Sequence, residues 1–496
     1  MLIPIDLPPG FYRNGTELES AGRWRAGNLV RWRDNTMQPV GGWVRRQDAG
    51  GSKLSAITSN PPRGAIGWQD NSGGRWIAVA SHDALKVMTS SGTITSITPG
   101  SLTSGRTDAA VNVGFGGGFF GKGLFGTPRP DTGTLSEATT WSLDTWGEYL
   151  VGCTPDDGTL WEWQLNTGAN AAAITNAPTD CSALFVTPER FLVALRAGGE
   201  PLKVQWSDKE DNTTWTAAAT NEAGDFTLQS GVSIMSGVNV RGQSLVLTEV
   251  DAYSMTYVGP PFVYGFERVG TSCGISSRRA LVAAHDGAFW MGNRAFFAYS
   301  GGAVQELQSD VADYVFTDIN QSQVSKVYAV ANSSFGEVWW FYPSGGSLEC
   351  DRYVAFNYRE NYWLIGEMDR TCGFDRGVFR YPVWLTSGGL IYNQETGTDH
   401  EADTPYAESG PFSLGQNTMH VVEMWPDEKT QGDVTATFKT RQYSNDTERE
   451  YGPYTMSAPT SVRFAGREVK LRITEASNND WRVGLPRLIV RDGGGR

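Results

Sequence analysis

The sequence holds few of the residues from which metal, redox and disulfide sites are built. Its 496 residues include four histidines and five cysteines. No two histidines fall in an H-E-x-x-H or H-x-x-x-H spacing, and no two cysteines form a C-x-x-C pair. Zinc sites and thiol frameworks depend on such spacings. We therefore expect no metal site and no cofactor, and we expect the cysteines to be buried thiols of a protein made in a reducing cytoplasm.

Charge and long apolar runs are scarce as well. Charged residues make up 19% of the chain, and the acidic ones prevail to give a net charge of −13. Nucleic-acid affinity comes from lysines and arginines that neutralise phosphates. The chain is therefore a poor candidate for gripping DNA, although a surface past which DNA slides is compatible with it. No apolar run approaches the roughly 18 residues of a membrane span, and the opening lacks the basic start of a signal peptide.

The chain is rich in glycine, aromatic residues and short apolar runs divided by turn signals. It has 59 glycines, and 12% of its residues are aromatic. An apolar strand, a tight turn and a second strand recur at intervals that are mostly near the roughly 40 to 50 residues of a propeller blade. The repeats start near Trp76, Glu148, Arg190, Leu245, Ala288, Glu337 and Val383. This pattern predicts an all-β fold with a β-propeller of about six or seven blades; a pair of β-sandwiches is the alternative.

The pattern divides the chain into three parts. We expect an N-terminal docking segment at 1–49, the propeller at 50–400 with a Gly/Phe-rich insertion at 113–134, and a smaller C-terminal β domain at 401–496. A short helix is predicted between two blades, at residues 310–316. The strands predicted in the C-terminal part are residues 421–425, 434–438, 469–473 and 488–490.

The first fifty residues are a basic exception in an acidic chain. Their arginines outnumber their acidic residues, and tryptophans are interleaved with them. Arginine and tryptophan are residue types that anchor protein interfaces. The segment is therefore a candidate docking surface for a partner subunit, with an ordinary edge strand as the alternative. The candidate docking residues are Arg23, Trp24, Arg25, Arg31, Trp32 and Arg33.

The insertion around Gly114 to Gly126 is rich in glycine and phenylalanine. It matches parts of two phosphate-binding glycine motifs, but Gly123 stands where a P-loop needs Ser or Thr, and the proline-rich sequence that follows argues against the required helix. We interpret it as a long loop that packs against another chain or constricts a passage; a plain surface loop is the alternative. The candidate channel-constriction residues are Phe115, Phe119, Phe120, Lys122 and Phe125.

Two segments bear a formal likeness to catalytic sites. Gly270–Gly274 matches the G-x-S-x-G elbow with Ser272 as nucleophile. That elbow works between a parallel strand and a helix, whereas these surroundings predict an antiparallel meander. The densest acidic cluster is interpreted as a solvated turn, and its residues are Asp208, Glu210 and Asp211. We expect no catalytic residue and no enzyme activity.

Several blocks of the sequence resemble a family of phage structural proteins. The opening block is the most specific, and the matches extend over nearly the whole chain. The blocks are Pro8–Thr16, Gly22–Trp24, Asn28–Trp32, Pro39–Trp43, Val204–Asp208 with Thr214–Trp215, Phe289–Met291, Glu337–Ser344, Trp481–Gly484, and the ending Arg487–Leu488 with Gly493–Arg496. They are similar to those of tail nozzle, or tail-tube terminus, proteins of short-tailed bacteriophages.

The resemblance implies a structural role in the virion. Such a protein would form a sixfold ring at the distal end of the tail, retain packaged DNA and line the channel through which the DNA leaves. Its partners would be further copies of itself, the head–tail adaptor ring, tail fibres or spikes, and DNA passing non-specifically through the channel. Assembly would take place in the host cytoplasm. An acidic channel repels a polyanion, which suits fast passage. A propeller-type tail protein that binds or cleaves glycans is the alternative.

Overall fold

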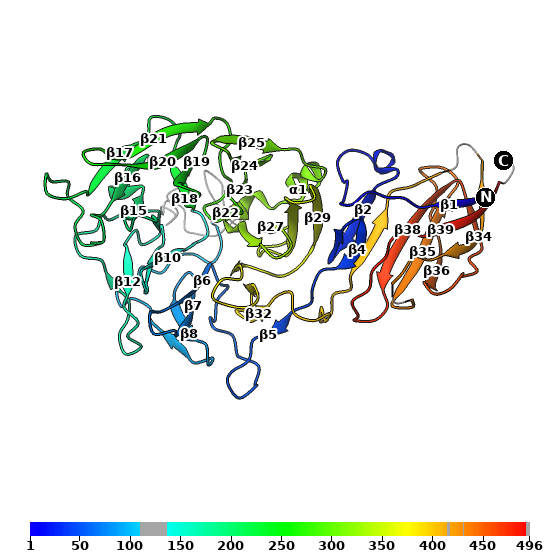
Figure 1. Ribbon diagram of the computed structural model, residues 1–496, viewed down its shortest axis with the longest axis horizontal. Coiled ribbons are helices and arrows are strands. Elements are labelled where there is room, and N and C mark those ends of the chain that lie inside the picture. Colours follow the sequence, from blue (N-terminus) through cyan, green and yellow to red (C-terminus); the bar gives the residue numbers. More distant parts are fainter. Residues whose placement is uncertain (110–135, 414–416, 430, 493–496) are drawn as a thin grey trace, which may run out of the picture.

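The computed structural model describes residues 1–109, 136–413, 417–429 and 431–492. In these residues the chain forms two bodies side by side, a broad disc of small sheets and a narrower pair of sheets (Figure 1). The first and last described strands pair with each other in the narrower body, far from the disc. The candidate constriction loop, with Phe115, Phe119, Phe120, Lys122 and Phe125, lies outside the described residues, and its role stays a prediction.

The disc is a β-propeller. Seven antiparallel four-stranded sheets form it in the described part of the chain. Their innermost strands contact one another in sequence, and β30 contacts β6, which closes the ring. The predicted all-β propeller is thereby confirmed. The blades are β6 (Gly64–Gln69), β7 (Arg75–Ala80), β8 (Leu85–Thr89) and β9 (Ile94–Ser96); β10 (Ser142–Trp146), β11 (Tyr149–Cys153), β12 (Trp161–Trp163) and β13 (Ala172–Ala173); β14 (Ala183–Val186), β15 (Leu192–Leu195), β16 (Lys203–Trp206) and β17 (Gly224–Thr227); β18 (Ile234–Val240), β19 (Gln243–Thr248), β20 (Ala252–Gly259) and β21 (Val263–Gly270); β22 (Leu281–Ala284), β23 (Gly287–Met291), β24 (Phe296–Ser300) and β25 (Ala303–Leu307); β26 (Tyr328–Asn332), β27 (Glu337–Tyr342), β28 (Arg352–Asn357) and β29 (Tyr362–Glu367); and β30 (Cys372–Phe374), β31 (Val383–Leu385) and β32 (Ile391–Asn393) with β5 (Val44–Arg45).

The predicted repeat finds the second strand of each blade rather than the first. Trp76 lies in β7, Ala288 in β23 and Val383 at the start of β31, and the other starting points occupy the same place in their blades. The apolar pattern does not mark the first strands. These strands converge near the propeller axis, where some positions have room only for a small residue. A Cβ at Gly237 in β18, for example, would lie 2.5 Å from the ring of Phe185 on the neighbouring blade.

The last blade is completed by the beginning of the chain. β5 pairs with β32, with Arg45 opposite Tyr392 and Val44 opposite Asn393. Residues 1–49 therefore do not form a separate docking segment. Their strands are divided between the propeller, which takes β5, and the narrower body, which takes β1 and β2. The boundary expected at residue 49 was wrong because strand pairing between distant segments leaves no local sequence signal.

The narrower body is a β-sandwich built from both ends of the chain. One sheet has the order β1-β39-β34-β37 and the other the order β2-β33-β38-β35-β36. Phe438 of β35 stacks on Phe464 of β37 across the two sheets at 4.5 Å between ring centroids. The strands are β1 (Leu2–Pro4), β2 (Trp24–Asn28), β33 (Tyr406–Ser409), β34 (Met419–Trp425), β35 (Val434–Arg441), β36 (Arg449–Thr455), β37 (Phe464–Gly466), β38 (Glu468–Glu475) and β39 (Arg487–Asp492). The strands predicted at 421–425, 434–438, 469–473 and 488–490 lie within β34, β35, β38 and β39.

Helix is scarce in the described residues. The helix predicted at 310–316 is observed as α1 (Ala312–Asp318), between the blades that end in β25 and begin with β26. Short 3-10 turns are η1 (Leu18–Ser20), η2 (Ala197–Gly199) and η3 (Gln321–Lys326). In the ranges that the structure describes, no helix is long and apolar enough to cross a membrane.

Buried tryptophans join neighbouring blades. Trp340 in β27 donates its indole N–H to the carbonyl of Ala280, which precedes β22, at 3.0 Å. Trp141, which precedes β10, donates to the carbonyl of Ser81 on the preceding blade at 2.8 Å. A buried indole needs such a partner for its N–H. These bonds therefore fix the angle between adjacent sheets while the rings fill the space between them.

Candidate functional site

The N-terminal residues 10–43 connect the sandwich to the propeller, and we call this contact the joint. The Phe11 N–H donates to the carbonyl of Trp363 at 2.9 Å, and the Leu29 N–H donates to the hydroxyl of Tyr353 at 2.9 Å. The hydroxyl of Tyr362 donates to the carbonyl of Trp32 at 2.5 Å. The joint thus lies on the outer strands β28 and β29 of one blade, between the two bodies in Figure 1.

The centre of the joint is a buried cluster of charges around Arg31. Residues Val30–Arg33 form β3, which pairs with β4 (Thr36–Pro39) as a hairpin. From β3 the Arg31 guanidinium reaches Glu337 at 3.0 Å and Glu395 at 2.5 Å, and it lies 3.7 Å above the ring of Phe335. Only 1% of Arg31 is exposed. The propeller thereby supplies both carboxylates that neutralise this cation.

Burial and charge act in opposite directions on the pKa values of this cluster. Burial raises the pKa of Glu337, and the Arg31 charge opposes that rise. Burial disfavours the charged form of Arg31, but Glu337 and Glu395 outweigh it and raise the pKa of the guanidinium. A buried ion pair need not add stability over an apolar contact, but removing one partner leaves an uncompensated buried charge. The cluster therefore holds the hairpin in one position on the propeller.

The predicted docking residues divide into a buried group and an exposed group. Trp24, Arg31 and Trp32 are buried inside the joint, with the two indole rings 6.1 Å apart. Their contacts are already made within the chain, so the prediction that these three side chains form a docking surface for another subunit was wrong.

The other three arginines do not come together as one surface. Arg23 pairs with Asp310 at 2.7 Å and Arg25 donates to the carbonyl of Thr16 at 3.2 Å. The Arg33 side chain is 64% exposed. These three side chains stay candidates for contact with a partner.

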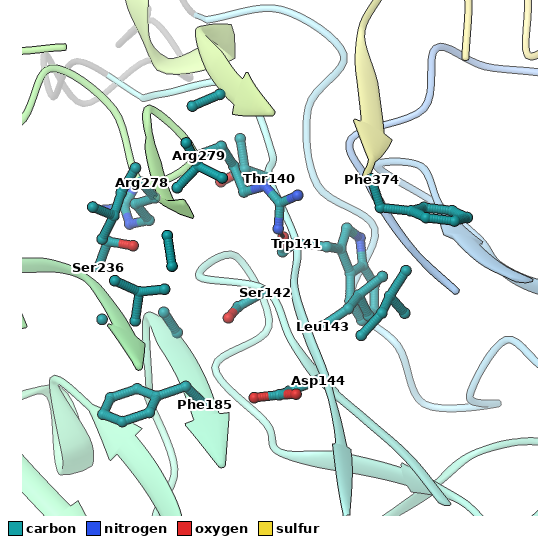
Figure 2. Close-up of a pocket in the computed structure, with 18 of the residues that line it drawn as sticks. Thr140, Trp141, Ser142, Leu143, Asp144, Phe185, Ser236, Arg278, Arg279 and Phe374 are labelled. Atoms are coloured by element: carbon teal, nitrogen blue, oxygen red, sulfur yellow. Dashed lines mark hydrogen bonds between the residues drawn. The ribbon is translucent and has the colours of Figure 1, made fainter. Parts of the chain in front are cut away.

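The propeller encloses a second candidate site, a cavity of about 440 Å³ on its axis. Residues from the innermost strand of every described blade line it, and we call it the central cavity. Its wall combines hydroxyl groups with apolar side chains, including Ser142, Ser236, Leu143 and Phe185 (Figure 2). A pocket of this size is suited to a small molecule.

Charged groups of opposite sign lie at separate places in the central cavity. Arg278 and Arg279 precede β22, whereas Asp144 lies in β10. In Figure 2 Thr140 and Ser142 lie between the arginines and Asp144. Asp144 accepts the N–H groups of Thr145 and Val186, both at 2.8 Å. Burial raises the pKa of Asp144 and these two hydrogen bonds partly oppose the rise.

The two arginines of the central cavity are held differently. Arg278 forms an ion pair with Glu137. Arg279 donates to the carbonyl of Trp141 at 3.1 Å, and it has no ion pair in the described part of the chain. Burial lowers its pKa. The sequence-based predictions did not include these residues. The one local pattern that could have indicated them is the Arg-Arg pair just before the first strand of a blade.

The segments with a formal likeness to catalytic sites have ordinary surroundings in the fold. Ser272 lies in the connection between β21 and β22, with a φ of 55°. Asp208 accepts the N–H groups of Lys209 and Glu222, and Asp211 accepts from Thr213, as in a polar turn. Within the described ranges no group of three or more His, Cys, Asp or Glu side chains could hold a metal ion.

The fold and the joint define a β-propeller protein with an attached β-sandwich. No protein-family model matches the chain, and no curated protein matches its sequence. Among solved structures it is similar to virginiamycin B lyase from Staphylococcus aureus, with 9% identity over 69% of this chain and 97% of the lyase, and a TM-score of 0.41. It is also similar to the WD40 propeller domain of Doa1, with 9% identity over 72% of this chain and 96% of the domain, and a TM-score of 0.42. BamB from Moraxella catarrhalis gives 10% identity over 75% and 95%, with a TM-score of 0.40. These likenesses are too distant to carry an argument about function, and the fold assignment stands on the observed sheets.

Proposed function

We propose that the chain is a structural tail protein of a short-tailed bacteriophage, the nozzle subunit that closes the distal end of the tail channel, retains DNA and conducts it during ejection. The proposal begins from the sequence blocks that resemble nozzle proteins. It places the protein in the virion, as a ring of identical copies next to the adaptor ring and the tail fibres or spikes. It assigns no chemical reaction to the chain.

One structural observation supports it above the others. The most specific resembling blocks, Pro8–Thr16, Asn28–Trp32 and Pro39–Trp43, build the joint. Phe11 and Arg31 contact the propeller, and the Val40 carbonyl contacts the ring Nε2 of His400 at 2.7 Å. These blocks therefore hold the sandwich and the propeller in a fixed orientation. A ring of identical subunits closes only when the rotation between neighbours is fixed, so a rigid two-body subunit suits this role.

The charge of the chain is compatible with a conduit. Each copy carries a net charge of −13, so a ring of copies would be strongly negative. A negative wall repels DNA and keeps it moving instead of binding it.

The direct test is to locate the protein on phage particles. Antibodies raised against the full chain and labelled with gold would be applied to intact and to DNA-ejected particles from the lysate that contains it. We expect label at the distal tip of the tail in both preparations. Label on peripheral fibres, or on no particle, would contradict the proposal.

The central cavity favours a second candidate function, a propeller-type tail protein that binds or cleaves glycans. A glycosidase needs two carboxyl groups facing the sugar, and Asp144 and Asp375 both line the cavity. Hydrolysis assays on host surface glycans, with Asp144→Asn as the matched variant, separate the two candidates. Cleavage that is lost in the variant would establish the glycan function. Absence of cleavage together with labelling at the tail tip would support the nozzle function instead.

A further inference from the structure

Arg279 is a partly buried cation on the wall of the central cavity, and its charge has no counterpart in the described residues. Of its five N–H donors, one is bonded, to the carbonyl of Trp141 at 3.1 Å. Its own carbonyl accepts the N–H of Ala329 at 2.7 Å, so its backbone is fixed to the next blade. A guanidinium does not lose its proton in a protein, so the positive charge stays inside the central cavity.

Other buried cations of the chain are compensated. Arg31 has two glutamates, Arg63 has Glu349, and Lys326 has Asp108 and Glu349. Arg370 lies over two aromatic rings, at 4.9 Å from the centroid of Trp43 and 5.0 Å from that of Tyr392. Arg279, which is partly exposed, has no such partner in the described residues and so differs from these buried cations.

Arg279 reaches across the cavity. It precedes β22, and the Trp141 carbonyl that it contacts precedes β10; the blades of β14 and β18 lie between these two in the ring. Arg278, beside it, uses Nη1 in its ion pair with Glu137, while its buried Nε–H has no hydrogen-bond partner in the described residues. Both arginines thus line the wall, with Arg279 directed toward Trp141 and Arg278 lying nearer to Ser236 (Figure 2).

The wall near the arginines offers neutral polar groups. Thr140 and Ser236 line the cavity, and their hydroxyls form no hydrogen bond with other described residues. The ring of Phe185 adds an apolar face (Figure 2). Hydroxyls beside an aromatic ring suit a hydroxylated molecule with one apolar face, and Asp144 further along the wall disfavours a second negative charge there.

We propose that the central cavity binds a small hydroxylated oxyanion, with the chemistry of an acidic monosaccharide, whose anionic group lies on Arg279. Guanidinium groups bind carboxylate and phosphate oxygens through paired, charge-assisted hydrogen bonds. Arg278 adds a second positive charge to the wall, and Thr140 and Ser236 provide hydroxyls that can hydrogen-bond with those of the ligand. This site is independent of the nozzle proposal, because it concerns what the cavity holds and not where the protein lies on a particle.

The test is calorimetric titration of the full chain with glucuronate, glucose and inorganic phosphate at one ionic strength. We expect glucuronate to bind roughly 10- to 100-fold more tightly than glucose, the range that a charge-assisted hydrogen bond provides. We expect phosphate to displace glucuronate, since the anionic group supplies most of the recognition. Equal binding of glucuronate and glucose, or glucuronate binding that saturating phosphate leaves unchanged, would overturn the proposal.

Two variants and one control assign the site. Arg279→Gln should weaken glucuronate binding at least about tenfold, whereas Arg268→Gln, on the outer strand β21 with a side chain 50% exposed, should leave it unchanged. Asp144→Asn removes the negative charge from the cavity and should tighten binding a few-fold, roughly. Should Arg279→Gln fail to fold, Asp144→Asn decides: unchanged or weaker binding in that variant would overturn the proposal.

Discussion

The joint and the central cavity each contain an arginine, and the two have different surroundings: Arg31 is buried, whereas Arg279 is only partly buried. Arg31 in the joint has two glutamates within 3.0 Å and an aromatic ring beneath it. Arg279 in the cavity has one backbone carbonyl and open space. A compensated buried cation fixes two parts of a molecule to each other. An arginine beside a cavity that has no counter-charge has donors left to bind a ligand.

The comparison gives each body a different role. The joint is closed, because the Arg31 cation is paired with two carboxylates and the indoles of Trp24 and Trp32 are buried. The cavity is open, because hydroxyls and guanidinium donors face a space that the chain does not fill. Structural rigidity is therefore concentrated at the joint, and any binding chemistry at the propeller axis. The following predictions test this division, beginning with the largest effect.

Removing the cation from the joint should be strongly destabilising. In Arg31→Met the carboxylates of Glu337 and Glu395 would stay buried without their partner, which costs roughly 3–5 kcal/mol of unfolding free energy. Urea unfolding followed by tryptophan fluorescence measures the loss. Arg33→Met is the matched control on the same hairpin, and it should change the unfolding free energy by less than about 0.5 kcal/mol. Equal effects of the two substitutions would contradict a closed joint.

The sandwich should carry a pH dependence through Glu475, at the end of β38. Burial raises the pKa of Glu475 to about 7, although the Trp481 indole N–H opposes the rise. The group titrates lower in the unfolded chain, so its protonated form favours folding. The stability it contributes is complete below the unfolded pKa of about 4.5 and is lost as the pH rises through 7.

Glu475→Gln isolates this contribution because glutamine mimics the protonated acid. The variant should match the natural protein at pH 4 and exceed it by roughly 3 kcal/mol at pH 8. Urea midpoints across this pH range provide the measurement. His400, whose Nδ1 lies 3.9 Å from the Glu475 carboxylate, titrates in both proteins and largely cancels in the difference. A difference that is the same at every pH would contradict the shifted pKa.

Removing the cation from the cavity should have the smallest effect on stability. Arg279→Met deletes a partly buried charge and one hydrogen bond to a carbonyl, so the unfolding free energy should change by no more than about 1 kcal/mol. The same urea unfolding experiment applies. A loss as large as that expected for Arg31→Met would mean that Arg279 holds the propeller together and is not kept for a ligand.

Local sequence patterns predicted much of the fold. The alternation of apolar strands and Gly, Asn and Ser turns located each described blade, and the short apolar runs after residue 404 located four strands of the sandwich. These elements were predictable because each is encoded by adjacent residues. The pairing of β5 with β32 was not, because two residues of the N-terminal segment supply it and nothing local distinguishes them.

The candidate site was harder to predict for the same reason. The arginines and tryptophans of the first fifty residues were predicted to dock onto a partner subunit, but Trp24, Arg31 and Trp32 make their contacts within the chain. The partners of Arg31, Glu337 and Glu395, lie more than three hundred residues away in sequence. The central cavity draws two to five residues from each described blade, so no contiguous motif marks Arg279 or Asp144.

The most direct test of the contrast between the two arginines is a crystal of the full chain soaked in bromide. Anomalous scattering locates bromide ions without relying on the shape of a ligand. The account predicts an anomalous peak in the central cavity within hydrogen-bonding distance of the Arg279 guanidinium, and none beside Arg31. A cavity without a peak, or a peak at Arg31 in the joint, would contradict it.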